Sequence, residues 1–266
     1  MAIGENMSKR EAIIDAIDMD YRELNEKIHE ILNENPNLEK IVLKNVLGQR
    51  FIGNGVQRKD LTIEIHGIPG GDLGMFMNGP RIVVYGNADH APGNTLDDGV
   101  IVIHGSGGDV TGHSMRGGKV FVRDNVGYRS GIHMKEYKDK FPVLVIGGEA
   151  KDFLGEYMAG GIIIALNIDN EGNDLGKIPG RMIGTGIHGG AIYIRGEVEK
   201  SQLGVAADIK EFTEEDRDKI RPHIEEFCKE FGLSDEIKEK LINSDYTKIA
   251  PISKRPFGKL YTPDLR

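Results

Sequence analysis

Apolar residues return at a fixed interval through the middle of the chain. Short segments in which apolar and polar residues alternate recur every nineteen residues between positions 63 and 196, apart from two longer steps. Three apolar columns keep this spacing: Ile63, Ile82, Ile101, Val120, Leu144, Ile163 and Ile192; Ile65, Val84, Ile103, Val122, Ile146, Ala165 and Ile194; and Met77, Leu96, Met115, Met134, Met158 and Ile187. Self-similarity at a period near twenty residues is typical of solenoids. The pattern therefore predicts a fold made of stacked, similar turns.

Glycines keep the same phase and mark the corners of the predicted turns. Glycine suits positive φ angles and places where backbones approach closely. Because each repeat has the same phase, its strand should lie parallel and in register with the next one, with rungs about 4.8 Å apart. The prediction is an all-β core, a right-handed single-stranded parallel β-helix of about seven turns with N- and C-terminal α-helical caps. The structural glycines are Gly67, Gly74, Gly86, Gly93, Gly105, Gly112, Gly131, Gly148, Gly155, Gly160, Gly161, Gly184, Gly189, Gly190 and Gly196.

Helical patterns flank the repeats and divide the chain into three parts. Residues 1–40 are predicted to be a helical segment, with Asp20 and Glu23 as a capping box. Residues 41–205 form the β-helix domain, and residues 206–266 a helical cap and an extended tail. Helices should begin at Thr213 and Ser234. We expect them to close the open end of the β-helix, since an uncapped rung exposes unpaired backbone groups.

Two turns are longer than the others, and their extra residues fall at 135–142 and 168–179. Insertions at the corners of a solenoid leave its core intact, so contacts with other proteins are expected there. Tyr137, Lys138 and Phe141 are the candidates for a partner interface.

Charge and composition limit the function further. A net charge of −8 argues against nucleic acid as the main partner. The single cysteine, Cys228, cannot alone hold an iron–sulfur cluster or a cysteine-rich zinc site. The N-terminal stretch lacks the apolar core of a signal peptide, and no apolar run is long enough to span a bilayer. We therefore expect a cytoplasmic protein.

One motif suggests hydrolytic chemistry. Residues 112–117 read Gly-His-Ser-Met-Arg-Gly, which is similar to the nucleophile elbow of α/β-hydrolases. That elbow requires glycine where Arg116 stands, and the repeat already accounts for Gly112 and Met115. A hydrolase that uses Ser114 is therefore the remote alternative.

Other groups of polar residues are explained by the repeat. The glycines of 105–108 lack the Gly-Lys-Ser/Thr signature of a phosphate-binding loop. A metal site of His90, Asp109 and His113 is an alternative to solvated corner residues. Asp97, Asp98 and Asp124 are interpreted as surface acids, and His66 and His104 lie two rungs apart, too far for one metal. The sequence thus predicts no catalytic residue and no metal site.

Two segments carry a resemblance to a known family. Residues 67–76 read Gly-Ile-Pro-Gly-Gly-Asp-Leu-Gly-Met-Phe, and residues 155–161 read Gly-Glu-Tyr-Met-Ala-Gly-Gly. With Glu156, Tyr157 and Met158 as its narrowest motif, the chain resembles the C-terminal GXGXG domain of the glutamate synthase large subunit over about residues 40–205. Because glutaminase and flavin-binding parts are missing, it looks like a stand-alone subunit of a split archaeal or bacterial-type enzyme.

This resemblance implies a non-catalytic scaffold in nitrogen assimilation. Such a subunit would bridge a glutaminase-like amidotransferase and an FMN-dependent glutamate synthase, which together move the glutamine amide nitrogen to 2-oxoglutarate. FMN and iron–sulfur clusters would belong to the partner subunits and none to this chain. The alternative is the equivalent subunit of an N-methylglutamate synthase or a formylmethanofuran dehydrogenase.

Overall fold

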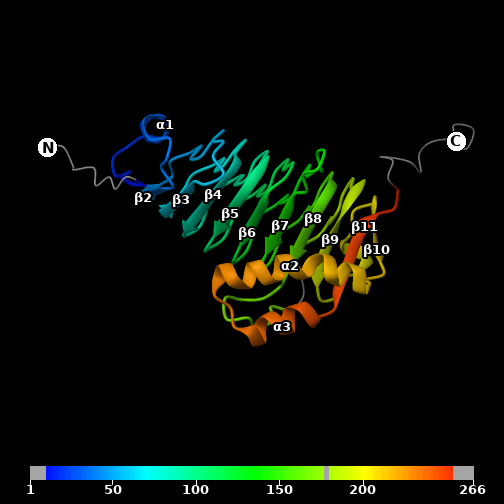
Figure 1. Ribbon diagram of the computed structural model, residues 1–266. Coiled ribbons are helices and arrows are strands. Elements are labelled where there is room, and N and C mark those ends of the chain that lie inside the picture. The colour runs from blue at the N-terminus through cyan, green and yellow to red at the C-terminus, as the bar shows by residue number, and fades with distance from the viewer. Residues whose placement is uncertain (1–9, 177–179, 254–266) are drawn as a thin grey trace, which may run out of the picture.

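The computed structural model describes residues 10–176 and 180–253 and contains one large sheet. The elements, in chain order, are β1 (Glu11–Asp15), α1 (Tyr21–Glu34), β2 (Lys40–Leu47), β3 (Thr62–Ile68), β4 (Asn78–Tyr85), β5 (Asp98–Ile103), β6 (Lys119–Val122), β7 (Val143–Ile146), β8 (Ala159–Ala165), β9 (Gly189–Arg195), the 3₁₀ turn η1 (Lys200–Gln202), β10 (Ala207–Lys210), α2 (Glu214–Phe231), α3 (Asp235–Asn243) and β11 (Tyr246–Pro251). The sheet runs in the order β1 to β9, then β11 and β10 (Figure 1). No helix of the described ranges is long and apolar enough to cross a membrane.

The predicted repeat sets the register of this sheet. Strands β1 to β9 pair in parallel, and Ile63 lies opposite Ile82, which in turn lies opposite Ile101. Side chains of the three apolar columns are at most 3% exposed, so they form the interior. The β-solenoid is thereby confirmed, but it has about six turns rather than seven. The difference arises because the prediction counted one turn for each of the seven strands β3 to β9. Seven successive strands are joined by only six complete turns.

The N-terminal cap contains a strand as well as a helix. Helix α1 begins at the predicted capping box, where Asp20 Oδ1 accepts a hydrogen bond from the Glu23 amide at 3.0 Å. The helix buries Leu24 and Ile28 in the same core as Ile14 of β1. Strand β1 was not predicted, and it extends the sheet by pairing with β2.

The C-terminal helices lie along the side of the solenoid rather than across its end, so the predicted position of this cap is wrong (Figure 1). The end is instead closed by β11, which pairs antiparallel with β9, and by β10, which pairs antiparallel with β11. Residues 254–266 of the predicted extended tail lie outside the described residues. Helices α2 and α3 do begin after the predicted N-caps, Thr213 and Ser234.

A second hydrophobic core explains why the helices lie on the side. From β5 onward the middle outward position of each strand is apolar and buried, as in Val102, Phe121 and Tyr193. Burial of apolar surface is the main driving force for packing such a face. The helical residues that cover this column are Ile220, Ile224, Phe227, Cys228, Leu241 and Ile242.

The predicted corner glycines divide into two groups. Ten have positive φ: Gly67, Gly74, Gly93, Gly112, Gly131, Gly155, Gly161, Gly184, Gly190 and Gly196. The others, Gly86, Gly105, Gly148, Gly160 and Gly189, have ordinary φ but leave no room for a side chain. At Gly189, for example, a Cβ would lie 2.1 Å from the Ala159 carbonyl oxygen. Close approach of neighbouring turns therefore requires glycine even where the backbone dihedrals do not.

Candidate functional site on the turn face

The side of the solenoid away from α2 and α3 is built from the turns that link the strands (Figure 1). We call this surface the turn face and define it by two columns of residues with positive φ and their neighbours. The columns are Phe51, Asp72, Ala91, Val110, Arg129, Phe153 and Met182, and Phe76, Thr95, Ser114, His133 and Tyr157. Backbone N–H groups of the second column bond carbonyls of the next turn, for example Ser114 to Ile132 at 2.8 Å. These axial bonds hold non-glycine residues in a conformation that they seldom adopt.

A chain of polar side chains crosses three turns of this face. Asn94 Nδ2 donates to Asp72 Oδ1 at 2.9 Å, and His113 Nδ1 lies 3.0 Å from Asn94 Oδ1. Beyond the imidazole, His113 Nε2 lies 3.5 Å from Ser114 Oγ. Burial is the main cause that lowers the pKa of His113, and the nearby His133 lowers it further. The neutral form of His113 is therefore favoured, with one ring nitrogen able to accept a proton.

Stacked rings continue the face toward the family motif. His133 stacks on Tyr157 with ring centroids 5.4 Å apart and an angle of 11° between the planes. His113 meets His133 edge-on at 6.1 Å. The Tyr157 ring also lies against Gly186, where a Cβ would be 2.3 Å from the ring. The absence of a side chain at Gly186 thus makes room for Tyr157.

The three motif residues have different positions. Glu156 is only 5% exposed and pairs with Arg129, whose guanidinium lies 4.6 Å from the Phe153 ring centroid. Tyr157 is 41% exposed on the turn face, whereas Met158 is fully buried in the interior column. A buried carboxylate without its partner would be costly, so the Glu156 to Arg129 pair fixes the backbone from which Tyr157 projects.

The proposed metal-binding residues are only partly brought together. His90 Nδ1 lies 4.0 Å from Asp109 Oδ2, but His113 bonds Asn94. In the described part of the chain, no group of three or more histidine, cysteine and carboxylate side chains is arranged to hold a metal ion.

The other acids and histidines singled out in the sequence have separate surroundings. Asp97 pairs with Lys140, and Asp124 with Arg123 at 2.8 Å. His66 and His104 stack on the two faces of Tyr85, with centroid distances of 4.8 and 5.1 Å. Cys228 belongs to α2 and is buried in the second hydrophobic core, and burial raises the pKa of its thiol to about 11.

The insertion at 135–142 is partly a surface and partly an anchor. Tyr137 is 50% exposed, and the Lys138 ammonium lies 5.1 Å from its ring centroid. Phe141 instead packs against the second hydrophobic core, where Lys219 of α2 lies 5.0 Å from its ring centroid. Of the interface candidates, Tyr137 and Lys138 thus lie on the surface, and Phe141 contacts α2.

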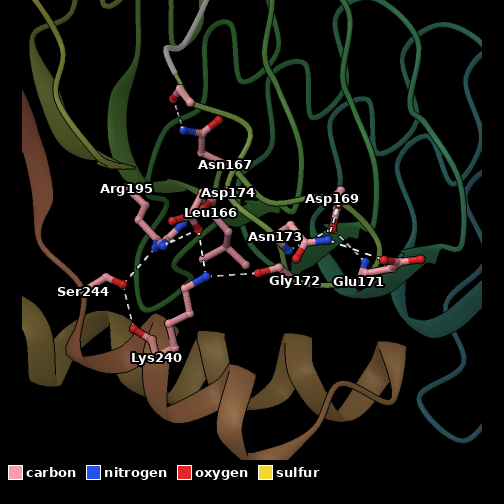
Figure 2. A network of polar contacts seen from close by, with 11 residues as sticks. Leu166, Asn167, Asp169, Glu171, Gly172, Asn173, Asp174, Arg195, Lys240 and Ser244 are labelled. Carbon is pink, nitrogen blue, oxygen red and sulfur yellow. Dashed lines mark hydrogen bonds and ion pairs between the residues drawn. The ribbon is translucent and has the colours of Figure 1, made fainter.

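The insertion at 168–179 is described up to residue 176, and this part is bound to the rest of the chain (Figure 2). Asp174 accepts a hydrogen bond from Arg195 of β9 at 2.6 Å and pairs with Lys240 of α3 at 2.9 Å. Lys240 also donates to the Gly172 carbonyl at 3.2 Å. These two cations lower the pKa of Asp174, Lys240 contributing the larger part. The described part of this loop therefore fastens α3 to the sheet.

Comparison with known proteins places this geometry in a family. The sequence profile of the GXGXG motif matches residues 11–252. The chain belongs to the GXGXG motif family. The resemblance of the Gly67 and Gly155 segments to a GXGXG domain is thereby confirmed. An uncharacterized protein of Methanocaldococcus jannaschii is 80% identical over 255 residues, covering 96% of this chain and 98% of that protein.

The two aromatic residues of the first insertion of this GXGXG protein should respond differently to truncation. We expect Phe141→Ala to lower the free energy of unfolding by about 1–3 kcal/mol, because it leaves a gap beneath α2. Tyr137→Ala should change it by no more than about 0.5 kcal/mol, as is usual at exposed sites. Chemical denaturation of both variants measures the difference, and equal losses would show that Phe141 does not anchor α2.

Proposed function

We propose that this GXGXG protein is a scaffold subunit of a glutamate synthase-like complex and is non-catalytic in glutamate formation. It would bridge a glutaminase-like amidotransferase and an FMN-dependent synthase subunit. These partners would transfer the glutamine amide nitrogen to 2-oxoglutarate, and they would carry the FMN and the iron–sulfur clusters. The family match over residues 11–252 is the observation that supports this proposal most directly.

The architecture is consistent with a supporting role. The solenoid interior is filled by stacked aliphatic and methionine side chains that are at most 3% exposed, which favours a rigid body. One side is already covered by α2 and α3, whereas the turn face exposes Phe76 at 50%, Tyr128 at 46% and Tyr157 at 41%. Aromatic residues are enriched in protein interfaces. The turn face is therefore the surface that we assign to a partner.

The central experiment is reconstitution with the two proposed partners. The synthase subunit is mixed with the glutaminase-like subunit, with and without this chain, and glutamate formation is measured with either glutamine or ammonia as nitrogen donor. We expect this chain to raise the glutamine-dependent rate and leave the ammonia-dependent rate unchanged, because a scaffold acts on the transfer between active sites. A glutamine-dependent rate that is the same without this chain would refute the proposal.

A matched pair of tyrosines tests the assigned surface. Tyr157→Ala should weaken partner binding about 30-fold, as expected for a tyrosine hot spot worth about 2 kcal/mol. Tyr85, at the end of β4, is 45% exposed on the side of the solenoid formed by the strands, which we call the strand side. Tyr85→Ala is therefore a control of similar exposure. Surface plasmon resonance with each partner gives the two affinities. If Tyr85→Ala weakens binding and Tyr157→Ala does not, the interface is on the strand side.

A further inference from the structure

We infer that Ser114 is a base-activated nucleophile that accepts acyl groups from small activated esters. This activity would be separate from the scaffold role and does not depend on it. The inference rests on a row of linked polar side chains from three successive turns, which are Asp72, Asn94, His113 and Ser114. A nucleophile next to a base that a third group orients is the general signature of covalent catalysis. Distances between nucleophile and base are often loose before a substrate binds, so 3.5 Å is compatible with this role.

The hydrogen bonds determine which nitrogen of His113 carries the proton. The carboxylate of Asp72 can only accept, so the amide Nδ2 of Asn94 must face it. Asn94 Oδ1 therefore faces His113 and accepts from Nδ1, which must carry the hydrogen. The remaining nitrogen, Nε2, is then unprotonated and faces Ser114 Oγ. Asn94 is thus a positioning residue that keeps the imidazole in the tautomer required of a base.

The backbone hydrogen bonds around Ser114 limit the reaction rate that this site can reach. The Ser114 N–H already bonds the Ile132 carbonyl at 2.8 Å, and the Met115 N–H bonds the Gly112 carbonyl at 3.4 Å. These two N–H groups are therefore not free to form an oxyanion hole, which can contribute 10²–10³-fold or more to the rate. General base catalysis alone supplies about 10²–10⁴-fold. The substrates should accordingly be reactive acyl donors with good leaving groups.

The reaction is a balanced ester hydrolysis in two steps. Ser114 Oγ attacks the carbonyl carbon and its proton passes to His113 Nε2. The ester C–O bond breaks, and His113 gives this proton to the departing alkoxide. Water then attacks the acyl-serine with His113 again as base, which releases a carboxylic acid and returns a proton to Ser114 Oγ. One ester and one water give one acid and one alcohol.

The test is covalent labelling of the full chain with a fluorophosphonate, followed by peptide mass spectrometry and by hydrolysis of p-nitrophenyl acetate. We expect one label per chain on Ser114, with fluoride as leaving group. Ser114→Ala should lose the label, and His113→Gln should react about 100-fold more slowly. Ser106→Ala is the control, because this half-buried serine occupies a nearby corner without a histidine base and should leave labelling unchanged.

The pH profile of the unaltered protein provides a second readout that needs no variant. Labelling should rise with pH and level off, with a midpoint below the ordinary histidine value of about 6.5. The reason is that burial and His133 favour neutral His113, aided by Arg116 and opposed by Asp72. Asn94→Ala should move this midpoint. A label on another residue, or a rate that does not depend on pH between 4 and 8, would overturn the inference without affecting the scaffold proposal.

Discussion

Gly155→Val is expected to lower the melting temperature by about 10 °C, twice the loss caused by Gly55→Val. Both glycines have nearly the same φ, +66° and +65°, so a valine is strained to a similar degree at either position. That strain costs about 1–3 kcal/mol. The two positions differ in their surroundings. A Cβ at Gly155 would lie 2.5 Å from Ile192 Cδ1, whereas a Cβ at Gly55 would have no atom within 4 Å.

The difference between the two variants therefore measures the packing of adjacent turns. Overpacking a dense core costs about 1–3 kcal/mol, and each kcal/mol lowers the melting temperature of a chain of this size by about 2–4 °C. Differential scanning calorimetry is the measurement, and Gly155→Ala replaces Gly155→Val if the latter does not fold. Equal losses at the two positions would mean that backbone strain dominates and that the corner next to Ile192 can adjust.

Asp216→Ala should lower the free energy of unfolding by about 3–5 kcal/mol, because it breaks a buried polar cluster at the start of α2. Asp216 is 7% exposed and accepts from the Tyr193 hydroxyl and from Lys248 Nζ, both at 2.8 Å. Truncation leaves these donors without their acceptor. Asp218 lies on the same helix, and its side chain is 75% exposed beside Arg221, so Asp218→Ala should cost less than about 1 kcal/mol. Urea denaturation followed by circular dichroism compares the two variants.

The same cluster makes stability dependent on pH in acid. Burial alone would raise the pKa of Asp216, but hydrogen bonds from Lys248, Thr213 and Tyr193 lower it to about 2. A carboxyl whose pKa is depressed in the folded state stabilises the fold above its unfolded value of about 3.9. Asp216 therefore contributes about 2.5 kcal/mol at neutral pH, and this contribution is lost as the pH falls from about 4 to 2. Asp216→Ala should show a correspondingly smaller loss of stability over that interval.

The period of the sequence was sufficient to predict the solenoid because each inward column must be apolar for the turns to stack. It did not predict where α2 and α3 lie. The signal was present in Val102, Phe121 and Val145, outward residues that are apolar without an evident reason. In the Ile82 turn the two outward residues differ, since Tyr85 is 45% exposed and Val83 only 7%. A sheet that is polar outside at one end and apolar at the other requires a helix on its flank.

The chain of polar side chains was harder to predict. Ser114 and His113 were noticed as a local motif. Asn94 lies 19 residues before His113, and Asp72 lies a further 22 residues before Asn94, so only the stacked register brings the three side chains into one row. The repeat contained this information, since residues one period apart are neighbours in a solenoid. What it could not supply is the direction of each side chain, which depends on the left-handed backbone of Asp72 and Ser114.

Helix α2 also constrains the number of turns between β4 and β9. Along its length it is fastened to β9 through Asp216 and Tyr193, to β6 through Glu226 and Lys119, and to β4 through Glu230 and Arg81. From Asp216 to Glu230 the helix rises about 21 Å at 1.5 Å per residue, and the five strand steps from β9 to β4 span about 24 Å at 4.8 Å each. The length of the helix therefore matches the length of this stretch of the solenoid. A gain or loss of one repeat between β4 and β9 would shift an attachment point by about 5 Å. Repeats in that stretch cannot be added or removed independently of α2.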